Sequence, residues 1–166
     1  GPMSIEEVVA IASEVAEALG VAHDNGIIHR DLKPSNIIVT DDPGSSNGSA
    51  PSTAGPVVKI LDFGLARITD SDVAATLVSE VGVIKGTLQY MGPEQARGDV
   101  DAIDVRSDVY ALGCVLWEML AGTAPFDGPT PQAILVSKLS DKTPSLRARR
   151  RSVPLEVERV IQRAMG

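Results

Sequence analysis

The sequence predicts a mainly α-helical domain with one small β-hairpin. Apolar residues recur at helical spacing over residues 5–22 and again over 107–120, and weaker helical patterns follow at 131–139 and 154–165. Short runs of β-branched residues indicate strands, and a stretch rich in Gly, Ser and Pro separates two of them. The chain has 166 residues, of which 43% are hydrophobic, so it has enough apolar surface for one core.

The first helix is expected to begin after Ser4. Ser4 and Glu7 have the spacing of a capping box, in which each side chain satisfies a backbone N–H that the helix leaves free. The turn-forming pair Asn25-Gly26 ends the pattern, so the helix should run to about residue 22. Its apolar stripe consists of Ile5, Val8, Ala12, Val15 and Leu19.

Strands are expected at residues 27–28, 37–39 and 57–61, where β-branched residues cluster. The last two enclose DDPGSSNGSAPSTAGP, residues 41–56, which is too poor in large apolar residues to bury a core. Lengthening a flexible loop costs only about 0.6 kcal/mol per doubling. We therefore expect residues 41–56 to be a flexible insertion at the tip of a hairpin.

Composition excludes several classes of protein. A net charge of −7 argues against a nucleic-acid partner, which would require a basic stripe. The longest apolar run, residues 109–117, is far shorter than the roughly 20 residues that cross a bilayer. The single Cys114 lies within that run, which suits a reducing cytoplasm and a structural thiol. Gly1-Pro2 resembles a scar of tag cleavage and is left out of the predicted domain.

Residues 29–36, HRDLKPSN, combine an Asp with a Lys two positions later and an Asn five positions later, which indicates phosphate and metal chemistry. LDFG at 61–64, GTLQYMGPEQ at 86–95 and DVYALG at 108–113 follow in order. With these four motifs the sequence closely resembles the carboxy-terminal lobe of a protein Ser/Thr kinase, of the kind that bacteria share with eukaryotes. The resemblance covers residues 3–166 and implies a kinase-like α+β fold.

The resemblance assigns the chemistry to five residues. Asp31 would orient the hydroxyl of the substrate, and Lys33 would cover the migrating phosphoryl group. Asn36 and Asp62 would offer oxygen ligands to Mg²⁺. Lys33, Asn36, Asp62 and Ile38 would together contact ATP. The plainer interpretation is a polar loop in which Asp31 and Asn36 satisfy turn amides, and the downstream motifs disfavour it.

The resemblance also implies regulation. Arg30 corresponds to an arginine that senses a phosphate on the activation segment, here residues 62–94. The counterpart of Thr87 bonds the catalytic Asp and Lys and completes the groove for the substrate. The other hydroxyls of this segment are either phosphate acceptors or solvated loop residues, and the candidate acceptors are Thr69, Ser71, Thr76 and Ser79.

Structural roles are implied for His29, Phe63 and Gly64, which belong to two of the motifs, and for Glu94 and Asp108. The counterpart of Asp108 holds the catalytic loop by accepting backbone N–H bonds. The counterpart of Glu94 pairs with an Arg of a last helix that is absent here, so Glu94 is expected to be unpaired or to have a different partner. Gly92 replaces the Ala that the family usually has, and Ser35 replaces an acidic residue that selects basic substrates in some members.

Two charged features have competing interpretations. Glu118 falls where some kinases contact a basic side chain of the peptide, but a solvated helix charge explains it equally well. Arg147, Arg149, Arg150 and Arg151 form the basic cluster of the chain. A surface loop with solvated charges is favoured for this cluster, and docking of an acidic partner is the alternative.

Residues 3–166 are thus expected to form a kinase C-lobe that lacks the N-lobe, with its Gly-rich loop, Lys and Glu. The implied function is Mg²⁺- and ATP-dependent phosphorylation of protein Ser and Thr hydroxyls in the cytoplasm, with this piece alone inactive. The alternative is a non-catalytic, pseudokinase-like or oligomeric binding scaffold. Expected partners are protein substrates, the N-lobe of the same protein, and a second copy that covers the exposed lobe interface.

Overall fold

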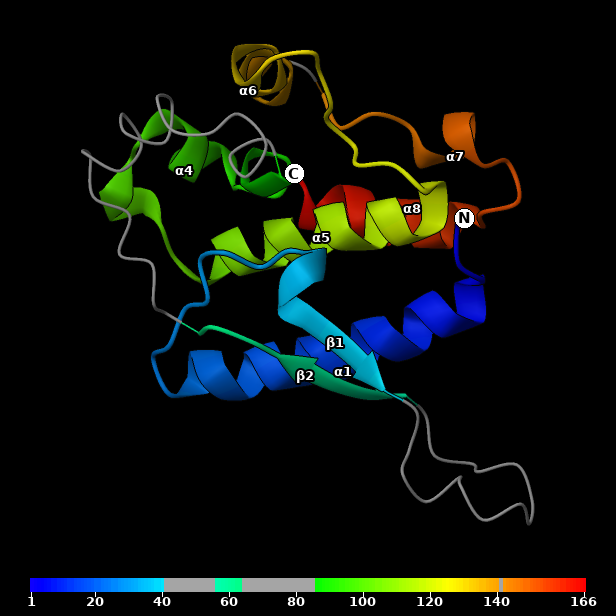
Figure 1. Cartoon of the computed structure of the whole chain (residues 1–166), viewed down its shortest axis with the longest axis horizontal. Helices are drawn as coiled ribbons and strands as arrows, with labels where there is room; N and C mark the ends of the chain where they lie inside the picture. The colour runs from blue at the N-terminus through cyan, green and yellow to red at the C-terminus, as the bar shows by residue number, and fades with distance from the viewer. Residues whose placement is uncertain (41–55, 64–85, 141) are drawn as a thin grey trace.

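The computed structural model describes residues 1–40, 56–63, 86–140 and 142–166. In this part of the chain the helices far outnumber the strands, which confirms the predicted mainly α-helical fold with one hairpin (Figure 1). The segments 41–55 and 64–85 lie outside the described residues, and with them the predicted insertion and most of the activation segment. The elements are α1 (Ile5–Asp24), η1 (Pro34–Asn36), β1 (Ile37–Thr40), β2 (Val57–Ile60), α4 (Pro93–Arg97), η3 (Val100–Ala102), α5 (Val105–Ala121), α6 (Pro131–Ser140), α7 (Leu146–Arg149) and α8 (Leu155–Ala164).

Helix α1 begins at the predicted capping box. The Ser4 N–H donates to Glu7 Oε2 at 2.9 Å, and the Glu7 N–H donates to Ser4 Oγ at 3.2 Å. At the other end Asn25 caps the helix, and Gly26 adopts a φ of 72°, which suits a residue without a Cβ. The buried stripe of the helix consists of Val8, Ile11, Val15 and Leu19.

Helix α5 is the centre of the core, with α1 on one side and α6 on the other in Figure 1. Trp117, Leu120 and Val115 are almost completely buried, which agrees with an apolar pattern that extends around most of the helix. Gly113 lets α8 approach α5 closely, because a Cβ at this position would contact Met165 and Ala164. The helical face that the sequence predicts to be buried therefore packs against two other helices.

The hairpin places two distant motifs side by side. Strands β1 and β2 are antiparallel, with Ile37 opposite Ile60 and Thr40 opposite Val57. In an antiparallel pair the residue before the first strand lies beside the residue after the second. Accordingly the Leu61 N–H donates to the carbonyl of Asn36 at 2.9 Å. The end of HRDLKPSN and the start of LDFG meet at this edge of the hairpin, which lies next to α1 (Figure 1).

Two predictions about the fold are wrong, and several short helices were not predicted. Residues 27–28 are not part of a strand, because an apolar β-branched pair is too short to specify pairing without a partner strand. The short helices α4, η3 and α7 were not predicted, since three to five residues carry no helical period. Arg147 and Arg149 lie in α7 rather than in a loop.

Arg150 departs further from the predicted solvated cluster. Its Nη1 donates to the carbonyl of Met3 at 2.6 Å and to that of Leu120 at 3.2 Å. This guanidinium therefore joins the chain before α1 to the end of α5.

No helix in the described part of the chain combines the length and hydropathy that a membrane span requires.

Candidate active site

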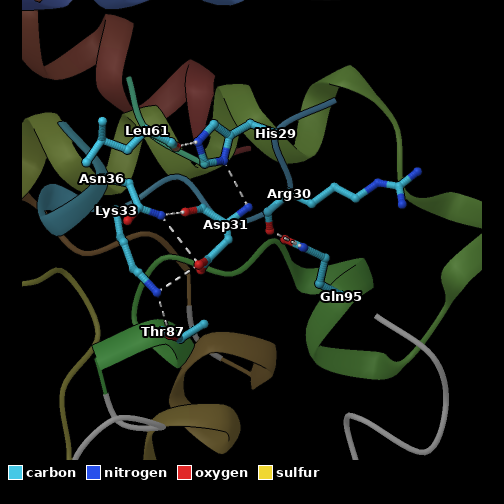
Figure 2. A network of polar contacts seen from close by, with 8 residues as sticks. All are labelled: His29, Arg30, Asp31, Lys33, Asn36, Leu61, Thr87 and Gln95. Carbon is cyan, nitrogen blue, oxygen red and sulfur yellow. Dashed lines mark hydrogen bonds and ion pairs between the residues drawn. The ribbon is translucent and has the colours of Figure 1, made fainter. Parts of the chain in front are cut away.

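Asp31, Lys33 and Thr87 form a continuous polar cluster, although Thr87 is 54 residues from Lys33 in the sequence (Figure 2). The Lys33 ammonium donates to Asp31 Oδ2 at 2.8 Å and to Thr87 Oγ1 at 3.2 Å. The Asp31 and Lys33 side chains are 30% and 22% exposed, so solvent and a substrate can reach both. The lysine therefore bridges the carboxylate of the HRDLKPSN motif and a hydroxyl of the GTLQYMGPEQ motif.

Asn36 is oriented by the same loop. Its Nδ2 donates to the carbonyl of Asp31 at 2.8 Å, and its own N–H donates to the carbonyl of Lys33 at 2.9 Å. Since the amide nitrogen is used in the first bond, the Oδ1 is the end of the side chain that remains as an acceptor. A neutral oxygen of this kind is a suitable ligand for a hard cation.

Asp62 comes directly after Leu61, whose N–H donates to the carbonyl of Asn36. It adopts a φ of 58°, in the left-handed region. Its carboxylate is exposed, and the hairpin places the residue at the edge where Asn36 lies. An Asp and an Asn oxygen fit the oxygen preference of Mg²⁺. In the described residues there is no group of three or more His, Cys, Asp or Glu side chains that could hold a metal ion.

Asp108 of α5 supports the loop that carries the HRDLKPSN motif. Its Oδ2 accepts the His29 N–H and its Oδ1 accepts the Arg30 N–H, both at 2.8 Å. The Nε2 of His23, in the last turn of α1, also lies 2.8 Å from Oδ2. Because Asp108 is 1% exposed, its charge is compensated by these donors rather than by water.

His29 is completely buried between two segments of the site. Its Nδ1 accepts the Asp31 N–H at 3.3 Å, and its Nε2 lies 2.8 Å from the carbonyl of Leu61. Both contacts are satisfied by the neutral ring with the proton on Nε2. The ring of Phe63 packs edge-on against the imidazole, with 4.9 Å between the ring centroids. His29 thus connects the HRDLKPSN loop to the segment that carries Asp62.

Arg30 has an unusual backbone and an unusual side chain. Its φ of 69° is rare for a residue with a Cβ, and the bond between its N–H and Asp108 accompanies this conformation. Gln95 of α4 donates its Nε2 to the carbonyl of Arg30 at 2.8 Å. Within the described residues the buried Nε of Arg30 has no hydrogen-bond partner, and Figure 2 shows its guanidinium directed away from Asp31. An anion or acceptor from another segment would complete this site.

Glu94 has a partner different from the Arg expected in the family. Its Oε1 accepts the hydroxyl of Ser107 at 2.5 Å. Gly92 accommodates this arrangement, because a Cβ at residue 92 would collide with the Glu94 carboxylate. The Gly92 N–H in turn donates to Gln95 Oε1 at 2.9 Å. The unusual glycine and the alternative partner of Glu94 are therefore parts of one local arrangement.

The segment after Thr87 is anchored to α5. The hydroxyl of Tyr90 donates to Glu118 Oε2, and burial together with this carboxylate raises the pKa of the phenol. Glu118 is thus bonded within the protein rather than fully solvated. Tyr90 and Phe126, which fall on packing positions of the kinase family, are both buried.

Some predicted residues are not part of this geometry, and other residues were missed. Gly64, Thr69, Ser71, Thr76 and Ser79 lie outside the described residues. Sequence reasoning did not identify His23, Gln95, Ser107 or Lys138, all of which contact the site or its supporting segments. The only signal in the sequence was the Gly92-x-x-Gln95 spacing, which resembles a capping box.

A helical lobe with an Asp-Lys-Asn loop beside a hairpin that is followed by Asp62 defines the class as the C-terminal lobe of a protein kinase. Residues 1–163 match the family model for the protein kinase domain. The chain belongs to the protein kinase family and, within it, to the bacterial Ser/Thr kinases.

Two curated relatives support this assignment. Serine/threonine-protein kinase PknB of Mycobacterium leprae is 38% identical over 167 residues, which cover 100% of this chain and 24% of the relative. Serine/threonine-protein kinase pkn2 of Myxococcus xanthus is 42% identical over 135 residues, which cover 81% of this chain and 15% of that relative. The chain thus spans about a quarter or less of the length of these relatives.

A solved structure, described as Rad53 1-466 in complex with AMP-PNP, shares the fold. It has a TM-score of 0.70 and 25% sequence identity, with 100% of this chain and 36% of that chain covered. The kinase-like fold expected from the four motifs is therefore confirmed.

Proposed function

We propose that the protein to which these residues belong transfers the γ-phosphoryl group of ATP to Ser and Thr hydroxyls of other proteins. The observation that carries the proposal is the bonded cluster of Asp31, Lys33, Asn36 and Thr87, to which the hairpin adds Asp62. Family membership supports the reaction class, and this cluster supports the retention of its chemistry. A lobe that had lost catalysis would be free to lose these contacts.

Each residue has a defined task in the proposed reaction. Asp31 accepts a hydrogen bond from the attacking hydroxyl and aligns it with the phosphoryl group. Lys33, already held between Asp31 and Thr87, places a positive charge where the transferred phosphoryl oxygens gather charge. Asn36 and Asp62 hold Mg²⁺, which when bound neutralises charge on the phosphates.

Two further residues complete the proposed site. Ile38, 41% exposed on β1, offers apolar surface to the adenine of the nucleotide. Arg30 has a buried Nε without a partner in the described residues, and this supports pairing with a phosphate on the activation segment. The candidate acceptors remain Thr69, Ser71, Thr76 and Ser79.

The reaction is tested with the full-length protein, Mg²⁺, labelled ATP and a protein acceptor. We expect phosphate transfer at about 1–100 per second, the range of ordinary kinases. The 166-residue chain alone should transfer none above background, because kinases also hold the phosphates with a Gly-rich loop and a Lys that this sequence does not contain. No transfer by the full-length protein with Asp31 intact would refute the proposal. Transfer at an ordinary rate by the short chain would refute the expected inactivity of the piece.

An oligomeric scaffold is a second candidate, favoured by apolar residues at the hairpin. Ile38, Val39, Val57 and Leu61 are between 36% and 42% exposed, although such side chains are normally covered. We therefore predict that the 166-residue chain self-associates through the exposed apolar residues of the hairpin, which the N-lobe of the same protein would otherwise cover. Analytical ultracentrifugation tests this, with Val39→Lys shifting the chain toward monomers. A monomer at high micromolar concentration would contradict the prediction.

The remaining assignments of the proposal concern partners and location. The protein substrates would be cytoplasmic, and a nucleic-acid partner is not expected for a chain with a net charge of −7.

A further inference from the structure

Lys138 in the last turn of α6 is a buried cation outside the catalytic cluster. It is only 4% exposed, although a lysine at a helix end normally extends its ammonium into water. Burial of an ammonium is costly unless it is paired or hydrogen-bonded. The contacts of Lys138 should therefore reveal what this charge does.

The Lys138 ammonium donates to the backbone carbonyl of Gln89 at 3.1 Å and to the hydroxyl of Tyr110 at 3.3 Å. It also lies 4.7 Å from the ring centroid of Tyr110 and 4.8 Å from that of Phe126. Both distances are within the range of a cation–π interaction. The charge is thus held by two rings of the core while it binds one backbone carbonyl of the 87–91 segment.

Gln89 lies in the middle of that segment. Two residues before it, Thr87 accepts the hydrogen bond from Lys33 of the catalytic cluster. One residue after it, Tyr90 is bonded to Glu118. The side chain of Gln89 donates to Asp127 Oδ1 at 3.3 Å, so both the loop before α6 and α6 itself hold this residue. Of these two contacts, the bond from Lys138 is the one that is made to the backbone of Gln89.

We propose that Lys138 is a positioning residue: its ammonium holds the backbone of residues 87–91, so that Thr87 stays on Lys33 and the segment keeps the shape that accepts the protein substrate. This inference rests on the proposed kinase function and adds a residue on which binding of the protein substrate depends. ATP binding should depend little on Lys138, because Asn36, Asp62 and Ile38 lie at the hairpin and Lys33 keeps its bond to Asp31.

The titratable groups around Lys138 are consistent with a charged ammonium at neutral pH. Burial lowers its pKa from 10.5 to about 8, and Cys114 and Glu94 oppose this shift. Burial raises the pKa of Cys114 to about 11 and also raises that of Tyr110, so both groups stay neutral near pH 7. Lys138 therefore loses its proton as the pH rises through 8, and with the proton it loses the cation–π and charge-assisted interactions.

The kinetic test uses the full-length protein with Lys138→Met, Lys138→Arg and the exposed control Lys142→Met. For Lys138→Met we expect the KM for the protein substrate to rise about tenfold, while the KM for ATP stays within about twofold. Lys138→Arg keeps the charge and should restore most of the affinity, and Lys142→Met should behave as wild type. Equal losses for both substrates, or no loss, would overturn the proposal.

The pH dependence separates positioning from a merely structural role. In the wild type, the KM for the protein substrate should rise between pH 7 and pH 9, and in Lys138→Met this rise should be absent. A wild-type KM that is constant over this interval, or an identical rise in both proteins, counts against the proposal. If Lys138→Met fails to fold, the pH dependence of the wild-type KM for the protein substrate still tests the proposal.

Hydrogen exchange tests the contact without relying on activity. The Tyr90 and Met91 amides both donate to the carbonyl of Thr87, at 3.2 and 3.3 Å. In Lys138→Met they should exchange about tenfold faster, with the amides of α1 unchanged. If the full-length wild type transfers no phosphate, the proposed function fails and exchange still decides whether Lys138 holds this segment. If the full-length protein is an active kinase but exchange is unchanged in Lys138→Met, the inference about Lys138 fails and the proposed function stands.

Discussion

Asp31→Asn in the full-length protein is expected to lower kcat by about 10²–10⁴ and to leave the KM for ATP within about twofold. The substitution keeps the size of the side chain and an oxygen that can accept the hydrogen bond from Lys33, but it removes the negative charge that aligns the attacking hydroxyl. The side chain is 30% exposed, so folding should be affected little. The measurement is steady-state phosphate transfer to a protein acceptor.

Asp101→Asn is the matched control for this substitution. Asp101 is an exposed carboxylate in η3, where it makes no contact with the catalytic cluster, and its loss should leave kcat unchanged. An Asp31→Asn protein with kcat within threefold of the wild type would remove the main support for catalysis by this cluster. That result would favour the oligomeric scaffold over the enzyme.

Asp108→Ala should have the largest effect on folding. The carboxylate is 1% exposed and accepts the N–H groups of His29 and Arg30, so its removal leaves two backbone donors without their acceptor. An unsatisfied buried donor costs about 1–3 kcal/mol, so the two donors together predict a loss of about 2–6 kcal/mol in the free energy of unfolding. Urea denaturation measures this loss as a lower midpoint with an unchanged slope.

Asp104→Ala provides the comparison at the start of the same helix. Asp104 is the N-cap of α5 and accepts the Arg106 N–H at 2.8 Å, but this side chain is 45% exposed. Loss of this exposed cap should lower the free energy of unfolding less than loss of the buried Asp108 carboxylate. If Asp108→Ala destabilised the chain no more than Asp104→Ala, water or other groups would have to satisfy the catalytic loop, and the support attributed to Asp108 would be wrong.

The two substitutions at Asp31 and Asp108 separate chemistry from positioning. Asp31 contacts the proposed substrate hydroxyl, whereas Asp108 acts through the backbone of His29 and Arg30. The first change should therefore lower kcat in a folded protein, and the second should lower stability before any effect on chemistry can be measured.

The sequence was sufficient to predict the kinase-like fold and the hairpin, and its motifs contain Asp31, Lys33 and Thr87, which the structure brings together. Helix α1 and its capping box, and the apolar coverage of α5, were also predictable. The reason is that capping, helical period and a short loop motif involve residues within a few positions of one another. Such local signals need no knowledge of the packing.

The partners of these residues could not be predicted in this way. His23 meets Asp108 across 85 positions, Gln95 bonds the carbonyl of Arg30 across 65, and Lys138 reaches Gln89 across 49. Glu94 pairs with Ser107 because Gly92 leaves room beside it. These contacts exist only after α1, α4 and α6 pack around α5, since side chains that are unrelated in sequence then share one buried space. The residues proposed to carry the chemistry thus lie in short sequence motifs. The contacts that hold these residues, and the surface proposed for the substrate, depend on how the helices pack.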